Sequence, residues 1–243
     1  MLPIAQYKDV ILKSVANNQV TIVVGETGSG KTTKLNEYLF EAGYGRRGII
    51  GVTEPRRIAA MSVARFVASN LNVPLGKTVA YKVRFDDLTH RDTALKFMTD
   101  GILLRELHFD PMLSQYSVIV VDEAHERSAN IDFLLGLLKN LLVQRPELRV
   151  IVASATIDAQ KFSTYFGGAP IITVSGRTHP VRIEWAAEDI RMATPQEFTR
   201  HVATKIQEVL ATTTMGDLLV FLTGVDEINA VWDALGNTGN SVE

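Results

Sequence analysis

Short apolar runs alternate with longer stretches of mixed apolar and polar residues along most of the chain. The short runs are rich in β-branched residues and almost continuously apolar, which is typical of strands covered on both faces. Such strands are predicted at residues 19–24, 48–52, 117–121 and 148–153. Helical spacing of apolar residues predicts helices at residues 32–41, 58–70, 101–109 and 129–143. This alternation predicts an α/β fold with a mostly parallel sheet.

The pattern is interrupted at residues 175–180, where Gly176 and Pro180 indicate a linker. After the linker, strands are predicted at residues 181–186 and 217–222, and helices at residues 196–211 and 226–235. This second stretch is too short for a complete doubly wound domain. We therefore expect one domain over residues 1–176 and a partial second domain over residues 177–243.

The composition narrows the class of protein. Hydrophobic residues make up 46% and charged residues 21% of the 243 residues, as in soluble globular proteins. The net charge of −2 means that any contact with nucleic acid must come from a local patch. The absence of cysteine excludes disulfides and zinc knuckles. Because the chain has neither a signal-peptide pattern nor a long apolar run, we expect a soluble intracellular protein that makes no membrane contact.

A phosphate-binding loop is predicted where the first strand meets the first helix. Residues 25–32 fit the pattern G-x-x-x-x-G-K-[ST]. The glycines let the backbone curl so that its N–H groups and the helix N-terminus face phosphate oxygens. Lys31 is expected to reach the β- and γ-phosphates of ATP, and the Thr32 hydroxyl to bind Mg²⁺. The predicted nucleotide-binding residues are Gly25, Glu26, Thr27, Gly28, Ser29, Gly30, Lys31, Thr32 and Thr33. The alternative is a glycine-rich turn with an incidental lysine, and a chance match has a probability of about 1 in 100.

Two acids end the apolar run at residues 117–121. If that strand neighbours the strand before the phosphate loop, Asp122 can hold the same Mg²⁺ as Thr32. Glu123 can then orient and deprotonate the attacking water. Without the phosphate loop, a solvated strand end would be the better interpretation. His125, two residues further on, is by itself more often a structural residue than a catalytic one.

Three further segments follow predicted strands or precede predicted helices. Arg56 and Arg57 precede a helix and can bind a phosphate backbone, although on their own a solvated helix start is the better interpretation. Thr99 and Asp100 also precede a helix, where such residues are ordinary caps. Two hydroxyl residues, Ser154 and Thr156, follow a strand, as in many turns. None of these segments is specific alone, so their order behind the phosphate loop carries the argument.

In this order the segments resemble DEAH-box helicases of superfamily two. The resemblance covers about residues 6–234 and rests on eight segments. They are GETGSGKTT (25–33), TEPRRIAAMSVA (53–64), YKVRF (81–85), MTDGILLRE (98–106), DEAHER (122–127), SAT (154–156), SGRTHPV (175–181) and FLTGVDEI (221–228). The resemblance implies a RecA-like P-loop NTPase fold followed by the start of a second RecA-like domain.

The resemblance also implies roles for individual residues. It makes Lys31, Asp122, Glu123 and His125 catalytic, with Thr32 and Asp122 as the metal ligands. It makes Ser154 and Thr156 coupling residues between nucleotide state and strand movement. Arg56, Arg57, Thr99 and Asp100 match residues that touch the nucleic-acid backbone, where little sequence preference is expected. The implied function is an ATP-dependent RNA helicase that uses ATP and Mg²⁺, binds single-stranded RNA and has an activating protein partner.

Two departures qualify that expectation. Phe66 stands where many relatives carry an arginine that packs on the nucleotide base. No arginine follows Arg200, so the late arginine motifs that complete the family's active site are missing. We therefore expect a fragment of a longer helicase that binds nucleotide but hydrolyses it poorly and does not unwind. The alternative is a P-loop ATPase, or a nucleotide-binding module, that does not act on nucleic acid.

Overall fold

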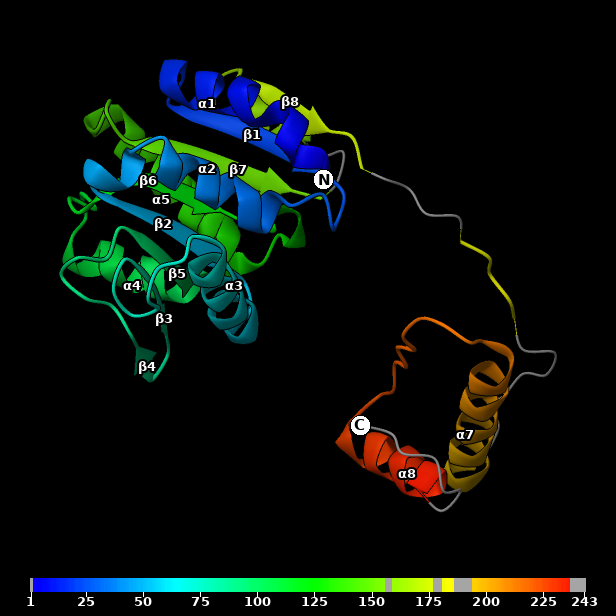
Figure 1. The fold of residues 1–243 in the computed structure, drawn as a ribbon. Helices are drawn as coiled ribbons and strands as arrows, with labels where there is room; N and C mark the ends of the chain where they lie inside the picture. The colour runs from blue at the N-terminus through cyan, green and yellow to red at the C-terminus, as the bar shows by residue number, and fades with distance from the viewer. Residues whose placement is uncertain (1, 156–158, 177–180, 186–193, 237–243) are drawn as a thin grey trace. The chain divides into compact units, whose positions relative to one another are not determined.

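The computed structural model describes residues 2–155, 159–176, 181–185 and 194–236 (Figure 1). The chain divides into two units, Met1–His179 and Pro180–Glu243. The predicted linker at residues 175–180 falls at this division, and its residues 177–180 lie outside the described residues. The predicted site residues all belong to the first unit, which therefore positions the site.

An eight-stranded sheet forms the centre of the first unit. The strand order is β4-β3-β5-β2-β6-β7-β1-β8, and only the pairing of β3 with β4 is antiparallel. The strands are β1 (Val20–Gly25), β2 (Ile49–Glu54), β3 (Val79–Val83), β4 (Asp86–Asp87), β5 (Leu95–Thr99), β6 (Tyr116–Val121), β7 (Arg149–Ser154) and β8 (Ile171–Val174). The predicted α/β fold with a mostly parallel sheet is confirmed.

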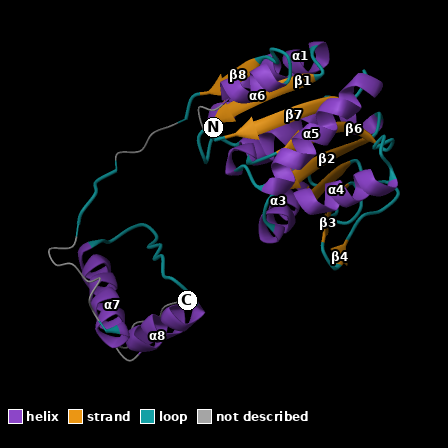
Figure 2. Cartoon of the chain, turned by 180° about the vertical axis from the view of Figure 1, so that it is seen from behind, coloured by secondary structure: helices purple, strands orange, loops and turns teal. Residues whose placement is uncertain are grey.

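Helices cover both faces of this sheet (Figure 2). One face carries η1 (Pro3–Tyr7), α1 (Lys8–Asn17), η2 (Lys31–Leu35), α2 (Asn36–Glu41) and α3 (Arg57–Asn70), with η3 (Tyr44–Arg46) after α2. The opposite face carries α4 (Asp100–Phe109), α5 (Ala129–Gln144) and α6 (Ala159–Tyr165), and the short η4 (Ala124–Glu126) precedes α5. Each face has its own apolar core, because alternate residues of the buried strands point to opposite faces.

Helix α5 shows how the sequence sets these helices. Its N-cap is Ser128, whose hydroxyl accepts a hydrogen bond from the backbone N–H of Ile131 at 3.2 Å. The buried residues recur with helical spacing at Ile131, Leu134, Leu135, Leu138, Leu141 and Leu142. This stripe packs α5 against β6 and β7. The helix therefore covers the face of the sheet opposite the face that η1 and α3 cover.

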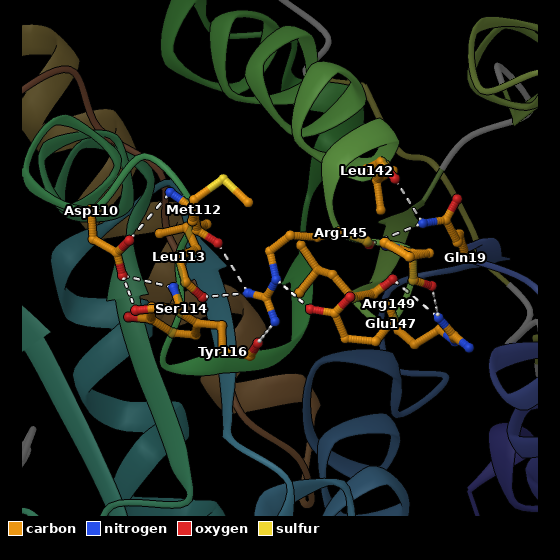
Figure 3. Close-up of polar contacts among 12 residues, drawn as sticks. Gln19, Asp110, Met112, Leu113, Ser114, Tyr116, Leu142, Arg145, Glu147 and Arg149 are labelled. Atoms are coloured by element: carbon orange, nitrogen blue, oxygen red, sulfur yellow. Dashed lines mark hydrogen bonds and ion pairs between the residues drawn. The ribbon is translucent and has the colours of Figure 1, made fainter.

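A partly buried arginine, Arg145, holds the segment that leads into β6. The guanidinium of Arg145, after α5, donates hydrogen bonds to the backbone oxygens of Met112 (3.0 Å), Leu113 (2.6 Å) and Tyr116 (3.1 Å) (Figure 3). Its Nε also donates to Oε1 of Glu147 at 2.6 Å. Three carbonyls that precede or begin β6 are therefore held by one side chain, at the strand end opposite Asp122.

The second unit consists of two packed helices in its described residues. Helix α7 (Pro195–Thr212) begins with a capping box between Thr194 and Glu197, and α8 (Val225–Gly236) packs on it through Ala203, Ile206, Val231 and Leu235. The strands predicted at 181–186 and 217–222 are wrong: residues 181–185 and 217–222 form no strand, and Ala186 lies outside the described residues. A strand requires hydrogen-bonded neighbours, and the described part of this unit offers none.

None of the helices in the described part of the chain combines the length and the apolar character that a membrane crossing requires.

Candidate active site

The predicted site residues lie along one edge of the sheet. The strands β5, β2, β6, β7 and β1 are consecutive and parallel, so their carboxyl ends meet at the same edge. Along this edge the order is Thr99 at the end of β5, Arg56 after β2, Asp122 after β6, Ser154 at the end of β7 and the phosphate loop after β1. The DEAH segment therefore lies between the segment of Arg56 and the segment of Ser154.

The phosphate loop has the curled backbone that its glycines predict. Gly28 and Gly30 have φ angles of 81° and 94°, in the left-handed region that favours glycine. At Gly30 a Cβ would lie 3.0 Å from side-chain atoms of both Leu2 and Ile4. The backbone N–H of Ile4 also donates to the oxygen of Ser29 at 3.1 Å. The segment before α1 thus contacts the phosphate loop at Ser29 and Gly30 and supports it.

Lys31 folds back over the loop and is almost completely buried, with 5% of its surface exposed. Its ammonium donates hydrogen bonds to the backbone oxygen of Gly25 and, at 3.0 Å, to that of Glu26. Burial lowers the pKa of Lys31, and the charges of Asp122, Glu123 and Glu26 act in the opposite direction. The three acids therefore favour the charged form of the Lys31 amine, which is the form that binds phosphate.

Thr32 and Thr33 lie in η2, directly after Lys31. The backbone oxygen of Thr32 accepts a hydrogen bond from Nδ2 of Asn36 at 2.7 Å, and Thr33 Oγ1 donates to Gly30 at 3.4 Å. Both threonines are half-buried at the start of the helical segment. Their hydroxyls thus belong to the first turn after the loop, where a metal bound to phosphate would lie.

Asp122 and Glu123 follow β6. This strand is not a direct neighbour of β1, the strand before the phosphate loop, as the metal site predicted from the sequence had assumed. The strand β7 lies between β1 and β6, so the phosphate loop and the two acids flank the end of β7. Asp122 is 1% exposed, and its Oδ1 accepts the backbone N–H of Glu123 at 2.8 Å. Burial and the charge of Asp122 raise the pKa of Glu123, while His125 and Lys31 lower it. The raised pKa makes the Glu123 carboxylate a stronger base than an exposed one.

Glu54 is a further acid of this site that the sequence analysis did not single out. It ends β2, is 2% exposed, and lies close enough to Asp122 for the two carboxyl groups to influence each other. Burial, followed by the charges of Asp122 and Glu123, raises the pKa of Glu54 to about 9. An acid directly after an apolar strand was the available signal, the same one that identified Asp122.

His125 and Ser154 lie where the DEAH segment meets the end of β7. Nδ1 of His125 accepts the backbone N–H of Ala155 at 3.2 Å, which joins the DEAH segment to the end of β7. The same nitrogen lies 3.2 Å from Oε2 of Glu123. Ser154 is fully buried at the end of β7. Thr156, the other predicted coupling residue, lies outside the described residues.

The four predicted nucleic-acid residues divide into surface and interior positions. Arg56 and Arg57 are exposed at the start of α3, and Thr99 is half-buried as the N-cap of α4. Asp100 is only 3% exposed, and the structure places its side chain beside Thr53 inside the domain. Because it is buried, the Asp100 side chain can support the start of α4, but it has almost no surface for contact with a nucleic-acid strand.

The backbone of the DEAH segment is strained at two positions. Glu123 and Arg127, which flank η4, have φ angles of 50° and 49°, in a region that side-chain-bearing residues rarely adopt. Arg127 is held by Asp132 through two hydrogen bonds of 2.6 and 3.0 Å. We call residues 122–127 the DEAH turn. Strain of this kind persists only where the surroundings hold it.

These residues fit a magnesium-nucleotide complex. A loop with inward-curling glycines is suited to phosphate oxygens, and Lys31 supplies the charge that such a ligand needs. A hydroxyl at Thr32 and a buried carboxylate at Asp122 are the oxygen donors that Mg²⁺ prefers. This arrangement can bind a nucleoside triphosphate and place a base, Glu123, beside it.

Comparisons with known proteins agree with this geometry. A family model described as AAA domain matches residues 15–161. Over 239 residues, the chain is 48% identical to the ATP-dependent RNA helicase HrpA of Escherichia coli (strain K12). That alignment covers 96% of this chain and 18% of the relative, so the chain spans less than a fifth of the relative's length. The resemblance drawn from the motifs is thereby confirmed: the chain belongs to the P-loop AAA-domain family and is similar over nearly its whole length to an ATP-dependent RNA helicase.

Proposed function

We propose that this chain is the ATP-binding motor part of an RNA helicase, which binds Mg²⁺-ATP and single-stranded RNA. In this proposal residues 1–176 are the first RecA-like domain and residues 177–243 begin a second. ATP hydrolysis in the longer protein drives unwinding or remodelling of RNA. The observation that carries the proposal is the order of motifs along the sheet edge, with the DEAH turn between the Arg56 segment and the phosphate loop.

The proposed chemistry assigns one task to each residue. Lys31 leaves the loop carbonyls and donates to the β- and γ-phosphates, while Thr32 and Asp122 hold Mg²⁺. The metal, when bound, neutralises charge on the phosphate oxygens. Glu123 takes a proton from the water whose oxygen attacks the γ-phosphorus. The bond from phosphorus to the β-γ bridging oxygen breaks, and ADP and phosphate are the products.

RNA is proposed as the substrate because the relative is named an RNA helicase and because exposed arginines follow β2. A general P-loop ATPase has no need for Arg56 and Arg57 at this edge. Their guanidinium groups suit phosphate oxygens, which all nucleic acids share. An activating protein partner belongs to the same proposal and rests on the family alone.

The nucleotide part of the proposal is tested by calorimetry of Mg²⁺-ADP and Mg²⁺-ATP binding to the chain. Glu123→Gln keeps the shape of the side chain and removes the base, so it should bind ATP with affinity within about twofold. Any ATP turnover should fall about 100-fold or more in this variant. No detectable uptake of either nucleotide by the unaltered chain would refute the proposed function.

The nucleic-acid part is tested by fluorescence anisotropy with a labelled single-stranded RNA. The double variant Arg56→Ala with Arg57→Ala should weaken strand binding about tenfold and flatten its dependence on salt, because two phosphate contacts are lost. Nucleotide affinity should not change. Unchanged strand affinity in the double variant would favour the alternative, a P-loop ATPase that does not act on nucleic acid.

A further inference from the structure

An ion pair joins the exposed arginine after β2 to the DEAH turn. Nη2 of Arg56 lies 3.2 Å from Oε1 of Glu126, although the two residues are 70 positions apart in the chain. The pairing of β2 with β6 brings them together, since both follow the carboxyl ends of neighbouring strands. The Arg56 side chain is 77% exposed and that of Glu126 is 32% exposed. A ligand from solution can therefore reach this pair.

Glu126 is also part of the strained turn that carries the catalytic base. It lies in η4, between Glu123 and Arg127, the two residues with left-handed backbone. The backbone N–H of Glu126 donates to the oxygen of Glu123 at 2.9 Å. On its far side the turn is anchored by the pairing of Arg127 with Asp132. The Arg56–Glu126 pair thus connects the turn that carries Glu123 to the residues after β2.

A guanidinium cannot offer the same N–H group to a carboxylate and to a phosphate at the same time. A phosphate that takes the N–H of Arg56 Nη2 facing Glu126 must therefore replace that carboxylate. An exposed ion pair contributes little stability, so a phosphate held by additional contacts can displace the carboxylate. After displacement the DEAH turn loses one of its two arginine anchors.

We propose that Glu126 is a positioning residue that occupies Arg56 until a nucleic-acid phosphate displaces it, and that its release resets the turn carrying Glu123. The inference rests on the proposed function, because it takes Arg56 as a strand contact. It assigns to Glu126 the step by which strand binding reaches the base. The signal passes from Arg56 to Glu126 through one ion pair and from Glu126 to Glu123 through three residues of backbone. It requires no movement of the second unit.

The test compares Glu126→Gln with the unaltered chain by anisotropy of a labelled oligouridylate. Removing the competing carboxylate should tighten strand binding about two- to fivefold, the range expected for an exposed ion pair. In an Arg56→Ala background the same substitution should have no effect, because its partner is gone. Glu126→Asp, which keeps the charge on a shorter side chain, should fall between the two.

Glu147→Gln is the matched control. Glu147 is also an exposed acid paired with an arginine, and its loss changes the net charge equally, but it follows α5 at the opposite edge of the sheet. If Glu126→Gln only made the chain less acidic, both variants would bind the strand equally well. The inference requires tighter binding in Glu126→Gln alone.

Hydrogen exchange of a peptide covering residues 122–127 gives the second readout. Strand binding should speed exchange in the unaltered chain, and Glu126→Gln should show the faster exchange without RNA. Equal strand affinity and equal exchange in Glu126→Gln and Glu147→Gln would overturn the inference while the proposed function stands. A chain that bound nucleotide but no strand would end both the inference and the RNA part of the proposed function.

Discussion

The imidazole of His125 accepts a hydrogen bond from the backbone N–H of Ala155, with 3.2 Å between Nδ1 and the backbone nitrogen. An N–H donor requires an unprotonated Nδ1, so the ring carries its hydrogen on Nε2 in this state. The same Nδ1 lies 3.2 Å from Oε2 of Glu123, which accepts a hydrogen bond from it only when Nδ1 is protonated. His125 can therefore bind the end of β7 or the carboxylate of Glu123, but not both through Nδ1.

Replacing His125 with alanine should loosen the end of β7 without removing the nucleotide site. The lost hydrogen bond predicts a decrease of about 1 kcal/mol in the free energy of unfolding. Hydrogen exchange at the Ala155 amide should become faster, while affinity for Mg²⁺-ADP stays within about twofold. His90→Ala is the control, because His90 Nδ1 likewise accepts a backbone N–H at 3.2 Å but lies in an exposed loop. Unchanged exchange at Ala155 would contradict the prediction.

Lys31→Ala should weaken nucleotide binding strongly. Charge-assisted hydrogen bonds to phosphates contribute about 1.5–3 kcal/mol, so we expect the dissociation constant for Mg²⁺-ADP to rise about 10- to 150-fold. Calorimetry measures this directly. Lys34→Ala is the control, since Lys34 lies in the same helical segment but pairs with Glu37 at 2.5 Å. Its affinity should remain close to that of the unaltered chain, and equal losses in the two variants would argue against a specific phosphate contact at Lys31.

Glu54 should make the nucleotide-free protein less stable as the pH rises. Its pKa is raised by burial from 4.5 to about 9, so the folded state keeps a proton that the unfolded state releases above pH 4.5. Stability is therefore fully present below pH 4.5 and is lost as the pH approaches 9. Glu54→Gln cannot ionise, so it should be about 1–3 kcal/mol more stable than the unaltered chain at pH 8.

Urea denaturation in EDTA between pH 5 and pH 9 measures this difference. Glu41→Gln is the control, because Glu41 is an exposed acid at the end of α2 that pairs with Lys8. It should leave the slope of stability against pH unchanged. Parallel slopes for Glu54→Gln and the unaltered chain would show that Glu54 does not hold this proton.

The sequence predicts most of the elements that position the site, and the reason is the burial of the central strands. The strands β1, β2, β6 and β7 are covered on both faces, so each reads as a continuous apolar run. The strand β5 was missed because Lys96 interrupts its pattern. That lysine is buried beside Glu106 at 2.7 Å and the Tyr116 hydroxyl at 2.7 Å, partners that only the folded chain brings together.

The arrangement of the site could be predicted in part. The motifs place Lys31, Asp122 and Glu123 at strand ends, and parallel strands put such ends on one edge. The order of strands is not written in local spacing, so the position of β7 between β1 and β6 could not be derived. For the same reason Glu54 was not recognised, since its contact with Asp122 exists only through the pairing of β2 with β6.

Arg145→Ala should cost more stability than any surface substitution in the first unit. The side chain is 11% exposed, and its guanidinium holds the carbonyls of Met112, Leu113 and Tyr116, which would be left without these donors. We expect a decrease of about 2–4 kcal/mol in the free energy of unfolding, measured by urea denaturation with an unchanged m-value. Glu147→Gln removes only the exposed ion pair and should cost at most about 1 kcal/mol. Because β2 and β7 hold β6 on both sides, Mg²⁺-ADP affinity should remain within about twofold in both variants. A cost for Arg145→Ala no larger than that for Glu147→Gln would mean that water satisfies these carbonyls equally well.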